Sequence, residues 1–325
     1  MGEERGTQDF AKVRAMHSPS MDTALLQQVQ NQISTVIKGK PTQVADCLAC
    51  LVAGGHLLIE DLPGVGKTTL AQALSLTLGL RFARVQFTAD LLPSDLLGVN
   101  VFDRTAGQFS FKPGPVFAQV LLADEINRAG PKTQSALLEA MEERQVTIEG
   151  LSHALPSPFF VIATQNPSEQ LGTYPLPESQ LDRFLMTIRL GYPDRTAERE
   201  LLSGRDSREQ LAELQAVMSP AQLQAAQALA RSLHVSPALL DYLQALLDAT
   251  RNGQWFVEGL SPRAGLAWLR AARAKALLAG RGHVSPEDLQ SVAVQVLAHR
   301  LKARAGSGRG SVEQVRALIE AVPLP

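Results

Sequence analysis

Apolar positions in the first part of the chain change their spacing several times, and each change predicts a new element. Between Asp22 and Ile37 they recur every three or four residues, which predicts an amphipathic helix capped by Asp22. A second helix is expected at about 42–52. The apolar run 57–59 then leads through a glycine-rich turn into another helical pattern. This order predicts a strand, a loop and a helix.

Further short apolar runs are each long enough for one buried strand, at 82–87, 120–123, 159–164 and 187–190. Because segments long enough for helices separate them, the pattern predicts an α/β fold with a mostly parallel sheet and helices on both faces. Two inserts with alternating apolar residues, 98–117 and 144–156, are predicted to be hairpins. In the first insert Phe102, Phe109 and Phe111 are interpreted as packing residues, with contact to a protein client as the alternative.

After the turn at 191–195 the chain becomes rich in Leu, Ala and Gln with helical spacing and shows no further strong strand. Helices are expected at 196–202, 220–232, 237–250, 262–279, 286–303 and 311–321. The chain is therefore expected to consist of a loose N-terminal tail (1–20), an α/β domain (21–192) and a smaller all-helical lid domain (193–325).

Composition narrows the class of protein. The 325 residues are 45% hydrophobic and 19% charged, and 31 Lys and Arg against 32 Asp and Glu give a net charge of −1. No overall basic field is available for nucleic acid, so a nucleic-acid partner is not expected. No apolar run reaches the roughly 18 residues of a membrane span, so direct membrane insertion is not expected. No secretory signal is recognisable, so the protein is expected to be cytoplasmic. Cys47 and Cys50, three positions apart in an apolar helical run, are interpreted as buried packing residues rather than a redox pair.

A phosphate-binding loop is predicted where the first strand turns into a helix. In such a loop the backbone N–H groups and the helix N-terminus bind phosphate oxygens, and glycine permits close approach. The residues expected to bind ATP are Pro63, Gly64, Val65, Gly66, Lys67, Thr68 and Thr69. Lys67 is expected to reach the β- and γ-phosphates and Thr68 to bind Mg²⁺. Asp61 occupies the first glycine position of the G-x-x-x-x-G-K-[ST] pattern, so the sequence departs from it there.

Polar residues follow two other predicted strands. Asp124 and Glu125 end the run VLLADE, where a buried parallel strand would bring them beside the phosphate loop. Asp124 suits the Mg²⁺ shell, and Glu125 suits orienting or deprotonating the attacking water. Asn166, in ATQNP, is expected beside them and able to hold the same water.

At this point the sequence resembles the MoxR ATPases of the AAA+ superfamily. The resemblance is carried by LADEINRAGPKTQSALLEAMEERQVTIEG, ATQNP, GTYPLPESQLDRF and LSPRAGLAWLRAARAKALLAGR, and it covers nearly everything from Asp22 to Leu301. It implies the branch of AAA+ proteins with an insert in the second helix and a hairpin before the sensor strand, which the two predicted hairpins fit.

The resemblance also implies roles for single residues. Asn166 resembles the polar sensor beside the Walker B strand. Arg183 resembles the arginine finger, which reaches the γ-phosphate of a neighbouring subunit, with an ion pair to Asp182 or Glu178 as the alternative. Arg263 resembles the second sensor, which contacts the phosphates of its own chain, with a plain surface arginine as the alternative. Arg128 is a weaker candidate for an intersubunit contact, and Ile37 is expected to contact the adenine.

The predicted function is that of a Mg²⁺-dependent ATPase whose subunits form a homo-oligomeric, hexameric ring. The resemblance further implies remodelling or maturation of a protein client together with a protein that carries a von Willebrand factor type A domain. Two other functions stay open. One is a nucleotide-gated switch or adaptor with little turnover, against which Glu125 and Arg183 argue. The other is a DNA-associated motor, which the net charge of −1 disfavours.

Overall fold

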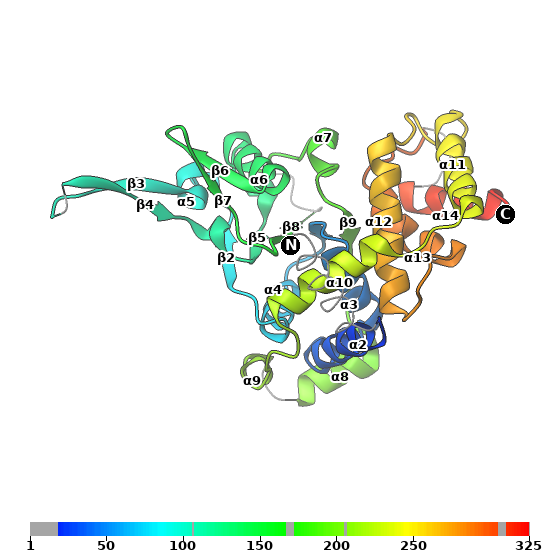
Figure 1. Ribbon diagram of the computed structural model, residues 1–325, viewed down its shortest axis with the longest axis horizontal. Coiled ribbons are helices and arrows are strands. Elements are labelled where there is room, and N and C mark those ends of the chain that lie inside the picture. The colour runs from blue at the N-terminus through cyan, green and yellow to red at the C-terminus, as the bar shows by residue number, and fades with distance from the viewer. Residues whose placement is uncertain (1–18, 106, 167–171, 205–206, 305–309, 325) are drawn as a thin grey trace, which may run out of the picture.

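A five-stranded parallel sheet, in the order β2-β5-β8-β1-β9, forms the centre of the protein. The computed structural model describes residues 19–105, 107–166, 172–204, 207–304 and 310–324 (Figure 1). The strands are β1 (Leu57–Glu60), β2 (Phe82–Gln86), β5 (Val120–Asp124), β8 (Phe160–Gln165) and β9 (Met186–Ile188). The predicted α/β class with a parallel sheet and a helical lid is confirmed.

The strands bury alternate side chains on the two faces of the sheet. Leu57 and Ile59 of β1 belong to one buried apolar cluster, and Leu58 belongs to the other. The first cluster also contains buried side chains of α2 (Pro19–Val36) and α3 (Pro41–Val52), and the fully buried Trp268 of the lid. The lid therefore shares one apolar core with one face of the sheet.

Several expectations about the N-terminal helices need correction. Asp22 lies inside α2, which begins at Pro19, so Asp22 is not the cap of that helix. The predicted tail falls mostly on residues 1–18, which lie outside the described residues. Helix α4 (Lys67–Thr77) follows β1, and α6 (Pro131–Glu143) follows β5 through a short turn. The short helices α5 (Pro93–Leu97) and α7 (Glu178–Leu181) were not predicted because single turns carry too little periodicity to detect.

Both inserts are hairpins, as predicted. Strands β3 (Gly98–Asp103) and β4 (Gln108–Pro113) project far from the body of the molecule, at the end opposite the lid (Figure 1). Strands β6 (Gln145–Ile148) and β7 (Leu151–Ala154) form the second hairpin. Phe111 stacks on His153 of that hairpin with ring centroids 4.0 Å apart, so its interpretation as a packing residue holds. Phe102 and Phe109 contact each other but stay 51% and 69% exposed, so they are not core residues.

The segment expected to form the lid contains α8 (Arg195–Ser203), α9 (Ser207–Ala212), α10 (Pro220–Ser232), α11 (Pro237–Arg251), α12 (Pro262–Leu278), α13 (Pro286–Leu297) and α14 (Ser311–Ala321). Helix α9 packs against α2 and α4 of the α/β part. Helix α13 was expected to reach Ala303 but ends at Leu297. The Arg300 side chain donates to the carbonyl of Phe184, and Ala303 pairs with Phe256 in an isolated β-bridge. The backbone is therefore no longer helical there. Across the described residues we find no helix with the length and hydropathy of a membrane span.

Cys47 and Cys50 are both buried in α3, as predicted. Burial, with a smaller contribution from the charge of Asp46, raises the pKa of the Cys47 thiol to about 12. A thiol that stays protonated is a poor nucleophile, so the interpretation as packing residues holds.

Candidate functional site

The turn between β1 and α4 has the geometry of a phosphate-binding loop. Gly64 and Gly66 have φ angles of +84° and +94°, a region that side chains other than glycine rarely adopt. No atom lies within 4 Å of the place a Cβ would take at either residue, so the space above the loop is open. Gly66 precedes the first residue of α4 without a side-chain cap, which leaves the first N–H groups of that helix available to an anion.

Lys67 and Asp61 are joined across this loop. The ammonium group of Lys67 donates to the main-chain carbonyl of Asp61 at 2.9 Å. The Asp61 carboxylate accepts from the main-chain N–H of Leu62 at 2.9 Å and of Gly191 at 2.6 Å. Asp61 is not among the described residues with positive φ, so the position that is glycine in the consensus pattern carries a side chain here without strain.

Asp124 ends β5 with both carboxylate oxygens hydrogen-bonded. Thr164 donates its hydroxyl to one oxygen at 2.6 Å, and Arg84 donates to the other at 2.7 Å. Asp124 is 8% exposed and lies at the same carboxyl edge of the sheet as the loop that carries Thr68. A hydroxyl and a carboxylate are oxygen ligands of the kind Mg²⁺ takes alongside phosphate oxygens and water, so these residues fit that ion. The described part of the chain holds no cluster of three or more His, Cys, Asp or Glu side chains suited to a metal.

Glu125 is held in a strained backbone conformation directly after Asp124. Its φ of +56° lies in the left-handed region, which costs a residue with a side chain about 1–3 kcal/mol. Gln86 donates to its carboxylate at 2.7 Å, and Arg128 lies 3.5 Å from the same oxygen. Arg128 therefore pairs within its own chain here. Asn166 follows β8 and is 6% exposed, at the same edge of the sheet.

The structure thus brings the loop 63–69, Asp124, Glu125 and Asn166 to one edge of the sheet, as predicted. It places Arg183 at the other edge. Arg183 precedes β9, whose Met186 pairs in parallel with Leu57 at the start of β1, whereas the phosphate loop follows the end of β1. The four residues of β1, at about 3.3 Å each, separate the two edges by about 13 Å.

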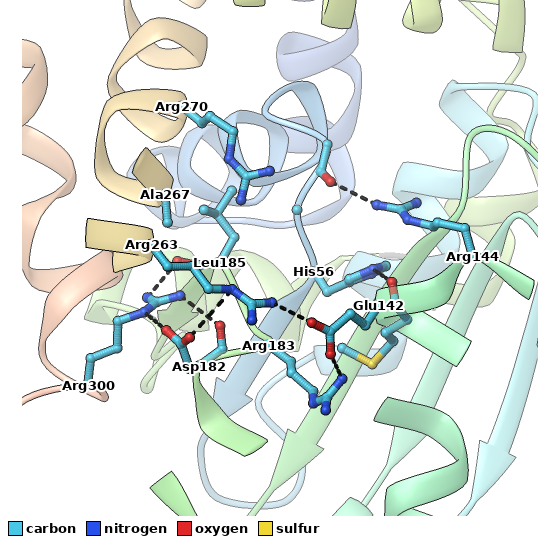
Figure 2. A pocket seen from close by; sticks show the side chains of 13 residues that line it. His56, Glu142, Arg144, Asp182, Arg183, Leu185, Arg263, Ala267, Arg270 and Arg300 are labelled. Carbon is cyan, nitrogen blue, oxygen red and sulfur yellow. Dashed lines mark hydrogen bonds and ion pairs between the residues drawn. The ribbon is translucent and has the colours of Figure 1, made fainter. Parts of the chain in front are cut away.

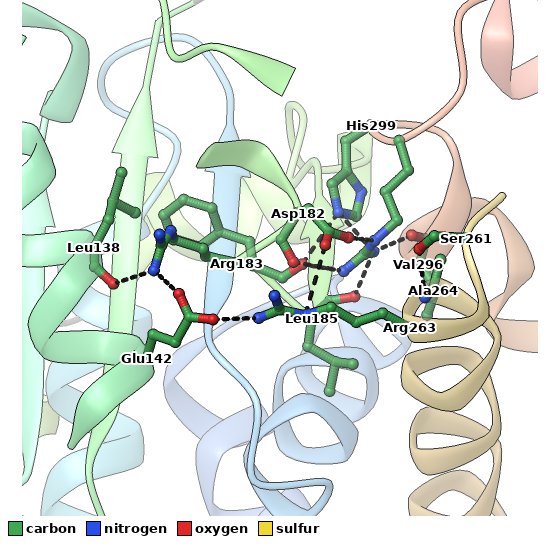
Figure 3. Close-up of polar contacts among 12 residues, drawn as sticks. Leu138, Glu142, Asp182, Arg183, Leu185, Ser261, Arg263, Ala264, Val296 and His299 are labelled. Atoms are coloured by element: carbon green, nitrogen blue, oxygen red, sulfur yellow. Dashed lines mark hydrogen bonds and ion pairs between the residues drawn. The ribbon is translucent and has the colours of Figure 1, made fainter. Parts of the chain in front are cut away.

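Arg263 lies beside Arg183, at the same amino edge (Figures 2 and 3). Its guanidinium group donates to Glu142 at 2.9 Å and lies 3.7 Å from the Asp182 carboxylate. The lid packs against β9 with the start of α12 at the amino edge, so the structure places Arg263 at the edge opposite the phosphate loop of its own chain. Its contact with the phosphates of its own chain stays a prediction.

A cavity of about 270 Å³ opens between these residues (Figure 2). The arginines that line it are Arg144, Arg183, Arg263, Arg270 and Arg300, and its carboxylates are Glu142 and Asp182. His56 at its floor adds no charge, because burial and the neighbouring Arg144 lower the pKa of its ring to about 3. Five cations less two anions leave an excess of three positive charges. The cavity is therefore suited to a multiply charged anion.

Sequence reasoning missed several residues of both edges. Thr164 and Gln86, which orient Asp124 and Glu125, carry no motif of their own. Arg270 could have been found, because it follows Arg263 by seven positions on one helix and therefore shares its face. Ile37 is 8% exposed within the apolar cluster shared with the lid, and its contact with adenine stays a prediction.

Two family models match the chain. The model of the ATPase family associated with various cellular activities (AAA) matches residues 56–186, and an AAA lid domain model matches 248–321. Both matched segments lie within the α/β and helical domains expected from the sequence.

Similarity to individual proteins extends over most of the chain. YeaC of Bacillus subtilis is 41% identical over 93% of this chain and 95% of its own. The chaperone MoxR1 of Mycobacterium tuberculosis is 42% identical over 83% of this chain and 74% of its own. Protein MoxR of Paracoccus denitrificans is 33% identical over 83% and 86%. The crystal structure of a protein from Cytophaga hutchinsonii, described as a candidate ATPase, superposes with a TM-score of 0.88 at 35% identity and covers 97% of this chain and 99% of that one.

Proposed function

The chain belongs to the MoxR family of AAA+ ATPases, and from this premise we propose that it hydrolyses ATP at sites shared between neighbouring copies of itself in a ring. One observation carries the proposal. The phosphate loop and the arginine-lined cavity lie at opposite edges of the same sheet, so neither half of the site is complete within one chain. A head-to-tail contact that repeats around a ring would set the cavity of one copy against the phosphate loop of the next.

The carboxyl-edge residues would bind and activate the reactants. The N–H groups of 64–68 hold the phosphates, and Lys67 moves from the carbonyl of Asp61 to the β- and γ-phosphate oxygens. Thr68 and Asp124 would hold Mg²⁺, which would neutralise part of the negative charge of the phosphates. Asn166 orients a water molecule and Glu125 takes its proton as the water oxygen bonds to the γ-phosphorus. The bond from phosphorus to the β–γ bridging oxygen then breaks, and ADP leaves with that oxygen.

The amino-edge residues of the neighbouring copy would complete the site. Arg183 acts as the arginine finger and stabilises the charge that spreads over the γ-phosphoryl oxygens. Because Arg263 lies beside Arg183 rather than beside its own phosphate loop, we assign it to the same neighbouring nucleotide. A hexamer is the stoichiometry proposed for this ring.

The energy of hydrolysis is proposed to remodel or mature a protein client. The similarity of the chain to MoxR1, which is named as a chaperone, supports this role. A protein with a von Willebrand factor type A domain is proposed as a partner, in keeping with the family resemblance. The exposed Phe102–Phe109 pair at the end of the projecting hairpin is available for contact with a client.

Mixing two inactive variants tests the shared site. Lys67→Ala removes the phosphate-binding cation but leaves the arginine cavity intact, and Arg183→Ala does the reverse. Each variant alone should hydrolyse ATP far more slowly than the parent, since a finger supplied in trans is worth on the order of 10³–10⁵ in rate. In a random 1:1 mixture under conditions of subunit exchange, roughly a quarter of the interfaces are intact, and phosphate release should recover accordingly.

A mixture that shows no activity above the separate variants contradicts the shared site. A nucleotide-gated switch is the second candidate function. It predicts that the parent protein binds ATP and changes its association state with negligible steady-state phosphate release, which the same assay distinguishes.

A further inference from the structure

Glu142 lies between the two arginines that the proposed function assigns to the neighbouring nucleotide. We propose that Glu142 is a positioning residue of the shared ATP site, whose carboxylate holds Arg183 and Arg263 side by side so that both meet one γ-phosphate. The inference rests on the proposed function, because it assigns a role to the same cavity.

The geometry gives each arginine its own oxygen of Glu142 (Figure 3). Arg183 donates through Nη1 to Oε2, and Arg263 donates through Nη2 to Oε1 at 2.9 Å. Arg183 comes from the α/β domain and Arg263 from the lid. A single carboxylate therefore fixes the relative position of two cations that belong to different domains.

The backbone around Glu142 is fixed by hydrogen bonds to other parts of the chain. It lies in the last turn of α6, where the carbonyl of Met141 lies 3.3 Å from Nε2 of the buried His56 ring. Two residues further on, Arg144 donates to the carbonyls of Phe159 at 2.8 Å and Gly54 at 3.0 Å. These contacts join the end of α6 to the loops at the amino edge of the sheet, so the position of the carboxylate is determined by the scaffold.

The charges explain why a carboxylate is needed at this point. Two guanidinium groups held close together repel each other, and an anion between them offsets this repulsion. Asp182 cannot supply that anion for both, because it pairs with the buried Arg300 at 2.7 Å and lies 3.7 Å from Arg263. Arg270 has no carboxylate within ion-pair distance in the part of the chain that the structure describes.

Glu142 positions the arginines without blocking them. The cavity keeps an excess of three positive charges after Glu142 and Asp182 are counted. Each guanidinium group carries five N–H donors, and Glu142 takes one donor from each. Arg183 also donates to the carbonyl of Leu138 at 3.1 Å. Nε of Arg263 lies 3.7 Å from the Asp182 carboxylate. The donors that are left over on each guanidinium group are available to phosphate oxygens.

The primary test is the steady-state kinetics of Glu142→Gln, which keeps the shape of the side chain and removes its charge. The kcat should fall on the order of 10²-fold, because displacing a catalytic group by about 1 Å lowers the rate by that factor. This decrease should be smaller than the decrease in Arg183→Ala. The KM for ATP and the Kd of a fluorescent ATP analogue should change less than about threefold, since the phosphate loop is untouched. Glu142→Asp, which keeps the charge on a shorter side chain, should recover part of the kcat.

The neighbouring Glu143→Gln is the matched control, because Glu143 is exposed on the same helix and does not line the cavity. It should leave kcat unchanged. A mixture of Glu142→Gln with Lys67→Ala should regain activity, because an intact loop then meets an intact cavity. A mixture of Glu142→Gln with Arg183→Ala should regain none, because both defects lie on the same side of the interface.

The outcomes separate this inference from the proposed function. If Glu142→Gln keeps the parental kcat while Arg183→Ala is inactive, the positioning role is overturned and the shared site stands. If Glu142→Gln loses activity together with thermal stability, and mixing with Lys67→Ala restores nothing, Glu142 has a purely structural role and the inference is again overturned. If Arg183→Ala itself hydrolyses ATP normally, the proposed function fails first.

Discussion

The carboxylate of Asp61 accepts a hydrogen bond at 2.6 Å from the main-chain N–H of Gly191, which lies 130 positions away in the sequence. This contact joins the start of the phosphate loop to the segment that leads from β9 into the lid. A side chain at a position where the consensus pattern has glycine therefore has a structural role in this protein.

Replacing Asp61 by the consensus glycine should destabilise the protein. Asp61→Gly leaves the N–H of Gly191 without its partner, which costs about 1–3 kcal/mol, and the new glycine adds conformational freedom to the unfolded chain. Asp61→Asn, which keeps an oxygen acceptor, should lie close to the parent. Urea unfolding gives the free energy of unfolding of all three proteins. An Asp61→Gly variant as stable as the parent contradicts this role.

Lys67→Ala should weaken ATP binding and leave folding unchanged. The variant loses a charge-assisted contact with the phosphates, which corresponds to roughly one to two orders of magnitude in Kd. In the absence of nucleotide it loses only the contact with the carbonyl of Asp61. Isothermal titration with ATP and thermal melting measure the two quantities. The exposed Lys112→Ala serves as a control for the loss of a positive charge, and undiminished binding by Lys67→Ala would rule out the predicted contact.

Glu125→Gln should bind ATP but hydrolyse it slowly. The amide keeps the size of the side chain and can still contact Gln86, but it cannot take a proton from water, which typically costs 10²–10⁴-fold in rate. The ATP-bound assembly should therefore persist, and sedimentation in the presence of ATP should show an enriched oligomer. The exposed Glu139→Gln on α6 is the matched control. Turnover at the parental rate would exclude Glu125 as the base.

His56 should make the stability depend on pH. Burial first, and then the charge of Arg144, lower the pKa of the ring to about 3, while Nδ1 accepts from the N–H of Val161 at 3.0 Å. Between about pH 6.5 and this value the unfolded chain binds the proton and the folded chain does not. The free energy of unfolding should thus fall by up to about 1.4 kcal/mol for each unit of acidification in this window from His56 alone. His56→Gln should flatten that slope, and curves that stay parallel to the parental one contradict the assignment.

The placement of the candidate site residues at one edge of the sheet was predictable from the sequence, because short motifs and strand ends determine it. Gly64 to Thr68 form their loop through adjacent backbone groups, and Asp124 and Glu125 share one edge with Asn166 because parallel strands end together. The hairpins were predictable for the same reason, since alternation and a turn occur within about twenty residues.

The docking of the lid was not predictable in the same way. The sequence pattern identifies the apolar face of α12 but does not identify its partner. The contacts that fix the lid join distant residues, such as Lys275 and Asp46 at 2.7 Å across 229 positions. Glu142 likewise has the appearance of an ordinary surface carboxylate in the run MEER, and only the fold brings it to Arg183 and Arg263.

The position of Arg263 leads to the most discriminating prediction, because the family resemblance assigns it to the nucleotide of its own chain and the proposed function assigns it to that of the neighbour. If Arg263 serves the neighbouring nucleotide, Arg263→Ala has its defect on the same side of the interface as Arg183→Ala. Mixing it with Lys67→Ala should then restore phosphate release at roughly a quarter of the interfaces, and mixing it with Arg183→Ala should restore none.

If Arg263 serves its own nucleotide, the two results exchange places. In that case Arg263→Ala and Lys67→Ala damage the same half-site and cannot complement each other, whereas Arg263→Ala supplies an intact finger to Arg183→Ala. Arg231, which is exposed on α10 of the lid, does not line the cavity, so Arg231→Ala should match the parent in every mixture. From the geometry we expect recovery with Lys67→Ala and none with Arg183→Ala, and the opposite pair of results would return Arg263 to its own chain.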